Sequence, residues 1–273
     1  MSDLGEGMKV AKANALQRQE RPHDELENTY GMDLARWLNK VTHGDCLEVM
    51  AAMPKHSVDL IVTSPPYNLL NSTGGGMKGK GGGRWKSAAL LKGYDQHDDN
   101  MPYGQYVAWQ RQCLHAMFRL LNDHGAIFYN HKWRVQGGLL QDRHEIVEGF
   151  PVSQIIIWQR SGGFNFNIQY YLPTYEVIYL ICKPAFRLAS VEAGDYGDVW
   201  EIPQARNNDH PAPFPVEIPR RCIETTGAKI VLDPFLGSGT TAVAAKLMDI
   251  DWVGIEKSQA YCKMAEKRLA TTT

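Results

Sequence analysis

Residues 229–256 read KIVLDPFLGSGTTAVAAKLMDIDWVGIE and contain the pattern that decides the fold. The apolar run 229–232 predicts a buried strand, which leads into a loop over 233–241 that contains two glycines. A helix is expected over 242–248, followed by a second apolar strand over 251–255. This order of strand, glycine loop, helix and strand is typical of a Rossmann-like unit that binds a nucleoside beyond the carboxyl end of its first strand.

Glu256 follows the second strand directly and is the residue expected to bind a ribose. It lies 17 residues after Gly239, close to the interval of about 20 that separates a glycine loop from a ribose-binding acid. Gly237 and Gly239 allow the backbone to approach a ligand closely. Thr241 and Ala242 stand where a dinucleotide fingerprint has its third glycine, which disfavours NAD and other pyrophosphate ligands.

A stiff turn follows an earlier strand. Residues 63–68 read TSPPYN and come directly after an apolar run over 58–62, so the turn also lies at the carboxyl end of a strand. Two consecutive prolines fix the backbone and contribute no N–H, which leaves carbonyl oxygens free to accept hydrogen bonds. Ser64 adds a hydroxyl and Tyr67 a flat aromatic face. We therefore expect the turn to hold a planar ring that bears an amino group.

The rest of the chain supplies the other elements of an α/β sheet. We expect further strands over 41–44, 125–130, 153–158 and 175–182, and further helices over 47–53, 103–121, up to residue 226 and at the C-terminal end. The last two of these strands form a candidate antiparallel pair. The Phe and Asn side chains of their connection, 161–167, either read DNA or pack on the body of the protein. Asp45 lies at a strand-to-helix junction, where it either caps the helix or contacts a ligand.

The segment after the turn differs abruptly in composition. Residues 74–93 contain many glycines, no acidic residue and five basic ones, which are Lys78, Lys80, Arg84, Lys86 and Lys92. Such a segment cannot bury a core of its own. Flexible cations beside a reactive turn suit the phosphates of a nucleic-acid backbone. The alternative is a glycine linker without a binding role.

The overall composition argues against several other classes of protein. The chain has 273 residues and a net charge of −1, so any contact with nucleic acid must come from a local basic surface. Its five scattered cysteines form no CxxC pair, which indicates reduced thiols, a cytoplasmic location and no metal site. No apolar run is long enough to span a membrane, and residues 1–27 lack the apolar core of a signal peptide.

Three motifs occur in an order that resembles a known family. SPPY at 64–67, HPAPFP at 210–215 and FLGSGTT at 235–241 resemble the β-group DNA amino-methyltransferases, in which an SPPY or DPPY motif precedes an FxGxG motif. The resemblance runs from about residue 42 to residue 269. It implies an α/β, Rossmann-like methyltransferase fold, a mostly parallel seven-stranded sheet with one antiparallel strand, flanked by helices. The run 175–182 is the candidate for the antiparallel strand.

The resemblance also implies S-adenosylmethionine as the cofactor, and no metal. It places Phe235 against the adenosine or sulfonium, Glu256 on the ribose and Asp45 on the adenine amino group. The cofactor-binding residues that it implies are Asp45, Cys46, His210, Phe214, Pro215, Asp233, Phe235, Gly237, Ser238, Gly239, Thr240 and Glu256. The implied catalytic residues are Ser64, Pro65, Pro66 and Tyr67, and the candidate DNA contacts are Asn68, Lys78, Lys80, Arg84 and Lys86.

Partners and domains follow from the same resemblance. It implies double-stranded DNA as the substrate, a homodimer, and a cytoplasmic, nucleoid-associated location. The polar composition of residues 1–30 predicts a flexible arm or, as the alternative, a helical extension, and 31–273 are expected to form a single methyltransferase domain. The candidate target-recognition insertions lie near 72–100, 161–172 and 184–209.

The expected chemistry depends on the poor nucleophilicity of an exocyclic amine. The lone pair of such an amine is delocalised into the base. Hydrogen bonds from its N–H groups to Ser64 Oγ and to the Pro65 carbonyl would localise that lone pair for in-line attack on a sulfonium methyl group. The target atom is unreachable in a stacked duplex, so the base must flip out, and Tyr67 offers a stacking face.

The identity of the target base stays open at this point. In the family, SPPY accompanies cytosine N4 more often and DPPY adenine N6, whereas adenine enzymes are more numerous. We predict adenine N6 first and cytosine N4 as the close alternative. Protein glutamine methyltransferases have an NPPY motif after the glycine loop, the reverse of the order here, so methylation of protein or RNA is a more distant alternative. A catalytically inactive DNA-binding homologue is another.

Overall fold

The computed structural model describes residues 32–68, 100–136, 138–160, 168–204 and 214–272. The predicted arm over 1–30 and most of the insertion near 72–100 lie outside these ranges. The helices are α3 (Met32–Ala35), α4 (Cys46–Ala52), α5 (Tyr103–Leu120), α6 (His144–Val147), α7 (Glu217–Thr226), α8 (Thr240–Leu247) and α9 (Gln259–Ala270), with a 3-10 turn η2 (Glu192–Tyr196). The strands are β1 (Lys40–His43), β2 (Val58–Thr63), β3 (Leu121–His131), β4 (Arg134–Gln136), β5 (Leu139–Gln141), β6 (Val152–Gln159), β7 (Tyr175–Cys182), β8 (Val199–Glu201), β9 (Ile230–Asp233) and β10 (Asp251–Glu256).

One mixed sheet organises the described part of the chain. Its eight strands have the order β1-β10-β9-β2-β3-β7-β6-β8. All neighbours pair in parallel except β7, which is antiparallel to both β3 and β6. The predicted fold class is confirmed, and β7 is the antiparallel strand that the sequence suggested. The strand in excess of the expected seven is β8, at the edge of the sheet.

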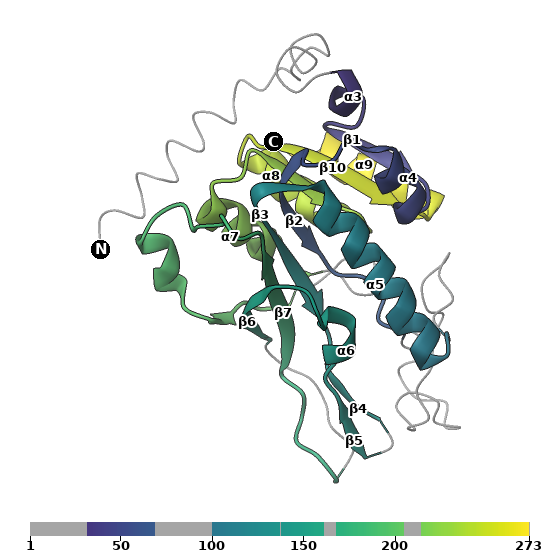
Figure 1. Ribbon diagram of the computed structural model, residues 1–273, viewed down its shortest axis with the longest axis vertical. Helices are drawn as coiled ribbons and strands as arrows, with labels where there is room; N and C mark the ends of the chain where they lie inside the picture. Colours follow the sequence, from purple (N-terminus) through teal and green to yellow (C-terminus); the bar gives the residue numbers. More distant parts are fainter. Residues whose placement is uncertain (1–31, 69–99, 137, 161–167, 205–213, 273) are drawn as a thin grey trace.

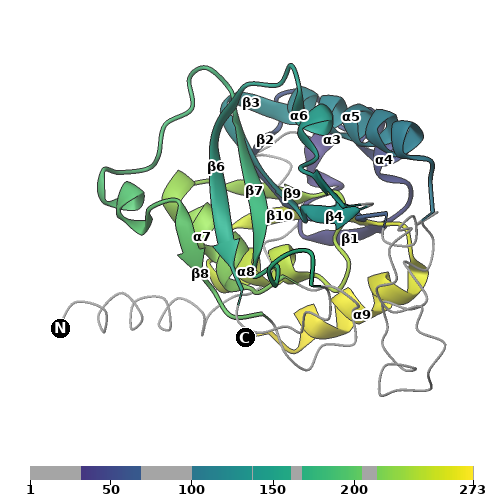
Figure 2. The same ribbon diagram turned by 90° about the horizontal axis from the view of Figure 1, so that it is seen from below.

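Helices cover both faces of the sheet, so the molecule has three layers (Figures 1 and 2). Successive side chains of a strand point to opposite faces, and β2 shows this clearly. Ile61 packs in the core beneath α3, α4, α5 and α6, whereas Leu60 and Val62 pack in the core against α7, α8 and α9. Because both faces are covered, the strands are nearly continuous apolar runs, as expected for a mostly parallel sheet.

The chain order switches direction between β9 and β2. From β2 the chain moves outward to β3 on one side, while β9, from the C-terminal part of the chain, lies on the other. Asp59 fixes this junction, because its Oδ2 accepts hydrogen bonds at 2.9 Å from the backbone N–H groups of Lys229 and Ile230. Ligands of open α/β sheets bind at such a switch point, beyond the carboxyl ends of the strands.

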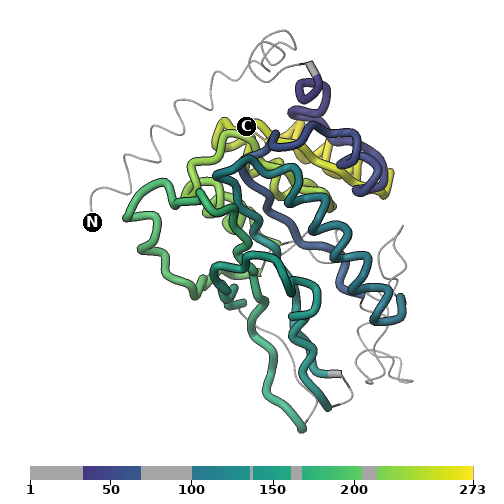
Figure 3. The backbone as a smooth tube through the Cα atoms, viewed as in Figure 1, coloured from purple at the N-terminus to yellow at the C-terminus, as the bar shows by residue number. Residues whose placement is uncertain are grey.

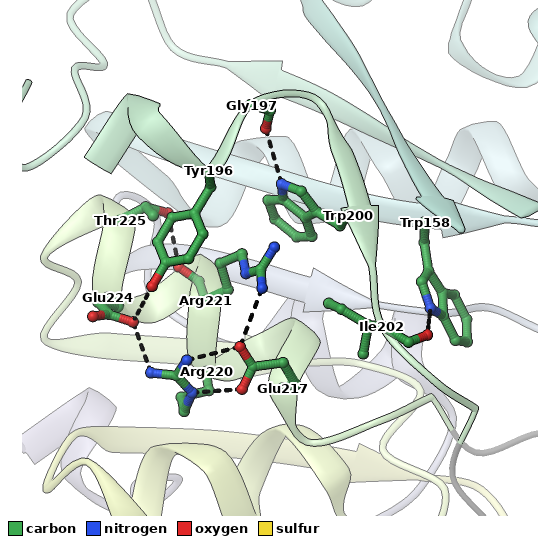
Figure 4. Close-up of polar contacts among 10 residues, drawn as sticks. All are labelled: Trp158, Tyr196, Gly197, Trp200, Ile202, Glu217, Arg220, Arg221, Glu224 and Thr225. Carbon is green, nitrogen blue, oxygen red and sulfur yellow. Dashed lines mark hydrogen bonds and ion pairs between the residues drawn. The ribbon is translucent and has the colours of Figure 1, made fainter. Parts of the chain in front are cut away.

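The segment between β7 and α7 is fastened to α7 by a cluster of charged and aromatic side chains (Figure 4). The Arg221 guanidinium lies 4.3 Å from the centre of the Tyr196 ring and 5.1 Å from that of Trp200. Tyr196 also donates a 3.1 Å hydrogen bond to Glu224, which pairs with Arg220 at 2.8 Å. These contacts hold both η2 and β8 against the helix.

A second extension projects from the opposite part of the sheet. The β4–β5 hairpin follows the carboxyl end of β3, and the segment 168–174 leads into β7 from the same end (Figure 3). Leu139 and Leu140 on the hairpin and Tyr171 on the segment are exposed.

Among the described residues, no helix combines the length and apolar character needed to cross a membrane.

Candidate active site

The candidate site lies along one edge of the sheet and has two sides. We call the ends of β1, β9 and β10, with the loop 234–239, the glycine-loop side. We call the turn 64–68 after β2, the end of β3 and the start of β7 the turn side. The sheet order places these two sides next to each other, because β9 and β2 are paired.

Glu256 organises the glycine-loop side. Its Oε2 accepts a 2.8 Å hydrogen bond from the Gly237 N–H, and its Oε1 accepts one of 2.7 Å from the Ser258 N–H. Burial raises the pKa of this carboxyl, and the two backbone donors oppose that effect. Each carboxylate oxygen has a further lone pair, so both oxygens can accept from two ligand hydroxyls as well.

Gly239 is required by the geometry of the same loop. Its φ is +85°, a left-handed conformation that favours glycine. A Cβ added at this position would lie 3.1 Å from the Cβ of Ala265 on α9. A larger residue would therefore be strained and would push the loop away from α9.

Asp45 does cap a helix, which was one of the two roles left open. Its Oδ1 accepts a 3.0 Å hydrogen bond from the Leu47 N–H, and its Oδ2 pairs with Lys257 Nζ at 3.1 Å. The adjacent side chain of Cys46 turns into the core, where its Sγ lies 3.9 Å from Cys113 Sγ. Only the backbone of Cys46 is therefore available for a cofactor contact.

The other residues predicted to bind the cofactor differ in where their side chains lie. Ser238 and Thr240 direct their hydroxyls to Arg268 of α9, at 3.4 and 3.0 Å, so they brace the loop from behind. Phe235 is partly buried, with its ring centre 5.7 Å from that of Trp109. Phe214 is buried in the core beside α7, and Pro215 is buried next to it. His210 lies outside the described residues.

Asp233 joins the two sides. It is fully buried, and its Oδ1 accepts from the Thr63 hydroxyl at 2.7 Å and from the Phe235 N–H at 3.1 Å. Its Oδ2 accepts from the Thr241 hydroxyl at 2.7 Å. Burial raises the pKa of this carboxyl to about 6, although the hydrogen bonds favour its charged form. Since Thr63 immediately precedes the turn, Asp233 fixes the turn relative to the glycine loop.

The turn itself is held from behind by α5 and β3. The Pro66 carbonyl accepts hydrogen bonds from Tyr106 Oη at 2.8 Å and from Gln110 Nε2 at 3.2 Å. Tyr106 Oη also lies 2.7 Å from Nε2 of His131, and burial lowers the pKa of this histidine to about 3. A neutral His131 therefore belongs to the support of the turn. Within the described residues, no donor lies against the carbonyl of Pro65.

A network of polar side chains joins the turn to β3 and β7. Ser64 Oγ lies 2.5 Å from Tyr67 Oη, which donates a 3.0 Å hydrogen bond to Glu176 Oε2. Asn130 Nδ2 donates to Tyr67 Oη at 2.7 Å and to Glu176 Oε2 at 2.9 Å, and lies 3.3 Å from Ser64 Oγ. Arg160 pairs with the other carboxylate oxygen of Glu176 at 3.4 Å. The turn motif is therefore one end of a buried network that extends to β7.

Sequence reasoning missed Asn130, Glu176 and Arg160. Glu176 had a usable signal, because it is the one charged residue in the otherwise apolar run 175–182. An acid in a buried strand needs a partner or a function. Its partners cannot be read from the sequence, since they come from other strands.

Asn68 has a structural role in place of the DNA contact that we expected. Its side chain is 1% exposed, its Nδ2 donates to the Met101 carbonyl at 2.8 Å, and its Oδ1 accepts from the Met101 N–H at 2.9 Å. Both polar atoms thus hold the exit of the turn against the start of the segment that leads to α5. We therefore leave Asn68 out of the proposed DNA contacts.

The remaining predicted residues lie outside the described ranges. These are the candidate DNA contacts Lys78, Lys80, Arg84 and Lys86. Within the described residues, no group of three or more His, Cys, Asp or Glu side chains is arranged to hold a metal ion.

This geometry defines a class of protein, a Rossmann-like α/β enzyme with a nucleoside-binding loop beside an acceptor-rich turn. A family model described as DNA methylase, for N6 and N4 methyltransferases, matches residues 58–267. The chain therefore belongs to this family, and it is a DNA methyltransferase that uses S-adenosylmethionine.

Individual relatives agree with the family. The type II methyltransferase M.BglII of Bacillus subtilis is 25% identical over 277 aligned residues, which cover 85% of this chain and 69% of the relative. The type II methyltransferase M2.MboI of Moraxella bovis is 26% identical, and the match covers 84% of this chain and 86% of the relative.

Solved structures share the fold. PvuII DNA methyltransferase, described as cytosine-N4-specific, superimposes with a TM-score of 0.64 at 17% identity over 84% of this chain and 85% of its own. A DNA modification methylase of Thermus thermophilus, solved with S-adenosyl-L-methionine, gives a TM-score of 0.61 at 24% identity over 85% of this chain and 93% of its own.

The residues present fit the cofactor. Glu256 offers oxygens for ribose hydroxyls, the Gly237 N–H holds the loop to that carboxylate, and the left-handed Gly239 packs closely on Ala265 of α9. Asp45 lies on the neighbouring strand end, where the His43 position of β1 pairs with Glu256 of β10.

Proposed function

We propose that this enzyme transfers the methyl group to the exocyclic amine of a base in double-stranded DNA, adenine N6 first and cytosine N4 as the alternative. The observation that supports this most is the set of hydrogen-bond acceptors at the turn. Ser64 Oγ and the Pro65 carbonyl are adjacent in the chain, and the Asn130 amide beside them has a buried Oδ1 without a partner. A primary amine with two N–H donors is the group that such a site accepts.

The glycine-loop side is proposed to hold the cofactor. Glu256 binds the ribose hydroxyls, Asp45 the adenine amino group, and Gly237 and Gly239 allow close approach of the backbone. Phe235 lies against the adenosine or sulfonium, and His210, Phe214 and Pro215 close over the methionine portion. When bound, S-adenosylmethionine supplies an electrophilic methyl group on a positively charged sulfur.

The turn side is proposed to prepare the nucleophile. Ser64 Oγ and the Pro65 carbonyl accept the two N–H groups of the amine and draw its nitrogen towards tetrahedral geometry, so that its lone pair faces the methyl group. The nitrogen would then be aligned to take the methyl group in line, with S-adenosylhomocysteine as the leaving group, and would release one proton to solvent. Positioning and pre-aimed acceptors account for most of the acceleration, because the methyl group is already activated.

The base must leave the duplex to reach these acceptors. Tyr67 is proposed as the surface on which it stacks. The ring of Tyr67 is only 5% exposed, and its hydroxyl is committed to the network with Glu176. Stacking on this ring therefore requires a neighbouring group to move aside.

The DNA backbone is proposed to contact Lys78, Lys80, Arg84 and Lys86. The insertions near 72–100, 161–172 and 184–209 are proposed to read the target sequence, and a homodimer and association with the nucleoid belong to the same proposal. Sedimentation tests the dimer.

Cytosine and adenine each have an argument in their favour as the target base. Serine at position 64 favours cytosine, since the family associates SPPY with that base more often. Adenine is placed first because adenine enzymes are the more numerous members and a serine hydroxyl accepts from either amine.

One experiment tests the proposal. The protein is incubated with unmethylated duplex DNA and methyl-labelled cofactor, and the DNA is digested to nucleosides and separated. Label in 6-methyladenine supports the first choice, and label in 4-methylcytosine supports the alternative. Label in 5-methylcytosine, or unlabelled DNA beside a labelled protein or RNA, contradicts the proposal. Cofactor and DNA binding without any transfer would indicate an inactive homologue.

A further inference from the structure

We propose that Glu176 is a positioning residue that turns the hydroxyl hydrogen of Ser64 away from the substrate, so that Ser64 Oγ acts only as an acceptor. This inference rests on the proposed function, in which Ser64 accepts an N–H group of the target amine. A serine hydroxyl both donates and accepts, and its hydrogen rotates to suit its surroundings. Some other group must therefore set its direction.

Glu176 determines the direction of the hydrogen bonds in this network. This side chain is 6% exposed on β7, and Arg160 Nη1 lies 3.4 Å from its Oε1. Arg160 is itself fixed, because its Nη2 donates to the Pro173 carbonyl at 3.0 Å. A carboxylate that is paired with a guanidinium has no hydrogen of its own and only accepts hydrogen bonds. The single hydroxyl hydrogen of Tyr67 therefore points to Glu176 Oε2, 3.0 Å away.

The direction of the Tyr67 hydroxyl in turn determines the direction of the Ser64 hydroxyl. The 2.5 Å contact between Ser64 Oγ and Tyr67 Oη needs one hydrogen between the two oxygens. Tyr67 has no second hydrogen to donate, so the hydrogen in this contact belongs to Ser64. Ser64 Oγ is then an acceptor only: Asn130 Nδ2 donates to it in a long contact of 3.3 Å, and its other lone pair is left for a further donor.

Asn130 reinforces this arrangement. Its Nδ2 donates to Tyr67 Oη and to Glu176 Oε2 at 2.7 and 2.9 Å. The flipped amide would place its carbonyl oxygen against an ionised carboxylate, which is repulsive. Asn130 therefore requires acceptors at these two positions, as the direction from Glu176 to Ser64 provides.

This arrangement explains how a neutral serine can replace the aspartate of a DPPY turn as a hydrogen-bond acceptor. In a DPPY turn the aspartate accepts whatever its surroundings, because it has no hydrogen to orient. A serine reaches the same state only when its hydrogen is bound elsewhere. Glu176, Asn130 and Tyr67 together bind it.

The first experiment is a double-variant cycle. In Glu176→Gln, the new side chain can donate to Tyr67, so the hydrogen of Ser64 is no longer directed. We expect methyl-transfer kcat to fall roughly 10- to 100-fold, with the KM for DNA and the cofactor affinity within about threefold of wild type. Adding Ser64→Ala should cause no loss beyond that of Ser64→Ala alone, because the two residues act as one unit. Additive losses would overturn the proposal.

Two further variants separate positioning from a structural role. In the Ser64→Asp background, Glu176→Gln should no longer lower kcat, because an aspartate needs no orientation. A tenfold or greater loss in that background contradicts the proposal. Glu217→Gln is the matched control, since Glu217 also pairs with an arginine, on α7, and this change should leave kcat unaltered.

The second experiment needs no activity. Neutron diffraction from deuterium-exchanged wild-type crystals should show one deuterium between Tyr67 Oη and Glu176, bonded to Tyr67, and one between Ser64 Oγ and Tyr67, bonded to Ser64. A deuterium bonded to Glu176, or Tyr67 donating to Ser64, would overturn the inference. If these positions are found but no DNA is methylated, the proposed function fails while the hydrogen-bond direction holds.

Discussion

The glycine-loop side and the turn side hold their polar groups in place by different means. On the glycine-loop side, backbone N–H groups bind the carboxylates, and two of these donors, Leu47 and Ser258, lie two residues from the acid that they contact. On the turn side, side chains bind one another across the sheet. Tyr67 and Glu176 are 109 residues apart, and Asn130 is 46 residues from Glu176. The first arrangement depends on local chain geometry, and the second on the correct order of β2, β3 and β7.

This difference indicates that cofactor binding and methyl transfer can be altered separately. A change on the glycine-loop side should alter cofactor affinity, and a change on the turn side should alter the transfer step. Asp233, whose carboxylate binds Thr63 before the turn and Phe235 in the glycine loop, should affect the two together.

Asp233→Ala is expected to have the largest effect, because it removes the acceptor for three donors that join the two sides. The free energy of unfolding should fall by about 2–3 kcal/mol, and both cofactor binding and methyl transfer should be lost. Urea denaturation and calorimetry measure these changes. Asp123→Ala, at an exposed position of β3, is the control. Normal cofactor affinity in Asp233→Ala would contradict the idea that Asp233 links the sides.

Tyr67→Ala tests the turn side alone. We expect kcat to fall roughly 100- to 1,000-fold because both the network with Glu176 and the stacking ring are lost, while calorimetry should give wild-type cofactor affinity. Tyr103→Ala, at the start of α5, where the hydroxyl donates to Glu145 at the surface, is the matched control and should transfer methyl groups normally. Unchanged turnover of duplex DNA by Tyr67→Ala would remove the turn from the mechanism.

Glu256→Ala tests the glycine-loop side alone. The dissociation constant for the cofactor should rise about 10- to 100-fold, as expected for loss of hydrogen bonds to a charged acceptor. At saturating cofactor, kcat should change little. Glu266→Ala, exposed on α9, provides the comparison. Wild-type affinity in a titration of Glu256→Ala would refute the ribose assignment.

The pH dependence of stability should separate the turn side from the Asp233 junction. Burial lowers the pKa of His131 from 6.5 to about 3, so between these values the unfolded chain takes up a proton that the folded chain refuses. His131 therefore lowers stability as pH falls through this window, by at most about 1.4 kcal/mol per pH unit. Asp233, with a pKa raised from 3.8 to about 6, has the opposite sign and favours folding as pH falls through its own window.

His131→Gln isolates the histidine contribution. Denaturation between pH 6.5 and pH 4.5 should show a smaller loss of stability in this variant than in the wild type. Identical pH profiles would mean that His131 is not held neutral in the folded protein.

The smallest effect is expected from the cationic segment that follows the turn. Replacing Lys78, Lys80, Arg84 and Lys86 by serine should weaken DNA binding and reduce the salt dependence of the association constant by at most three to four units of slope, about 0.9 per phosphate contact. Cofactor affinity should not change. An unaltered slope would identify the segment as a linker.

The sequence predicted the glycine-loop side better than the turn side. The loop 233–241 and Glu256 are close in the chain, and their spacing reports their geometry directly. The turn was also recognised, but its partners were not. The contact of Ser64 with Asn130 requires β3 to lie parallel beside β2, and that of Tyr67 with Glu176 requires β7 to lie antiparallel beside β3.

Local patterns also failed at the edges of the fold. The short strand β8 and the turn η2 have little apolar periodicity, and they are held by the rings of Tyr196 and Trp200 around Arg221. Asn68 was predicted as a DNA contact, whereas the fold uses both of its amide atoms internally.

The most direct test of the account locates the transferred methyl group on the base. A duplex whose exocyclic amines are labelled with nitrogen-15 is methylated by the wild-type protein, and the isolated methyl nucleoside is fragmented in a mass spectrometer. The account predicts that methyl carbon and nitrogen-15 stay together in one fragment, from adenine or from cytosine. A methyl group found on a ring nitrogen or on a ring carbon would contradict it.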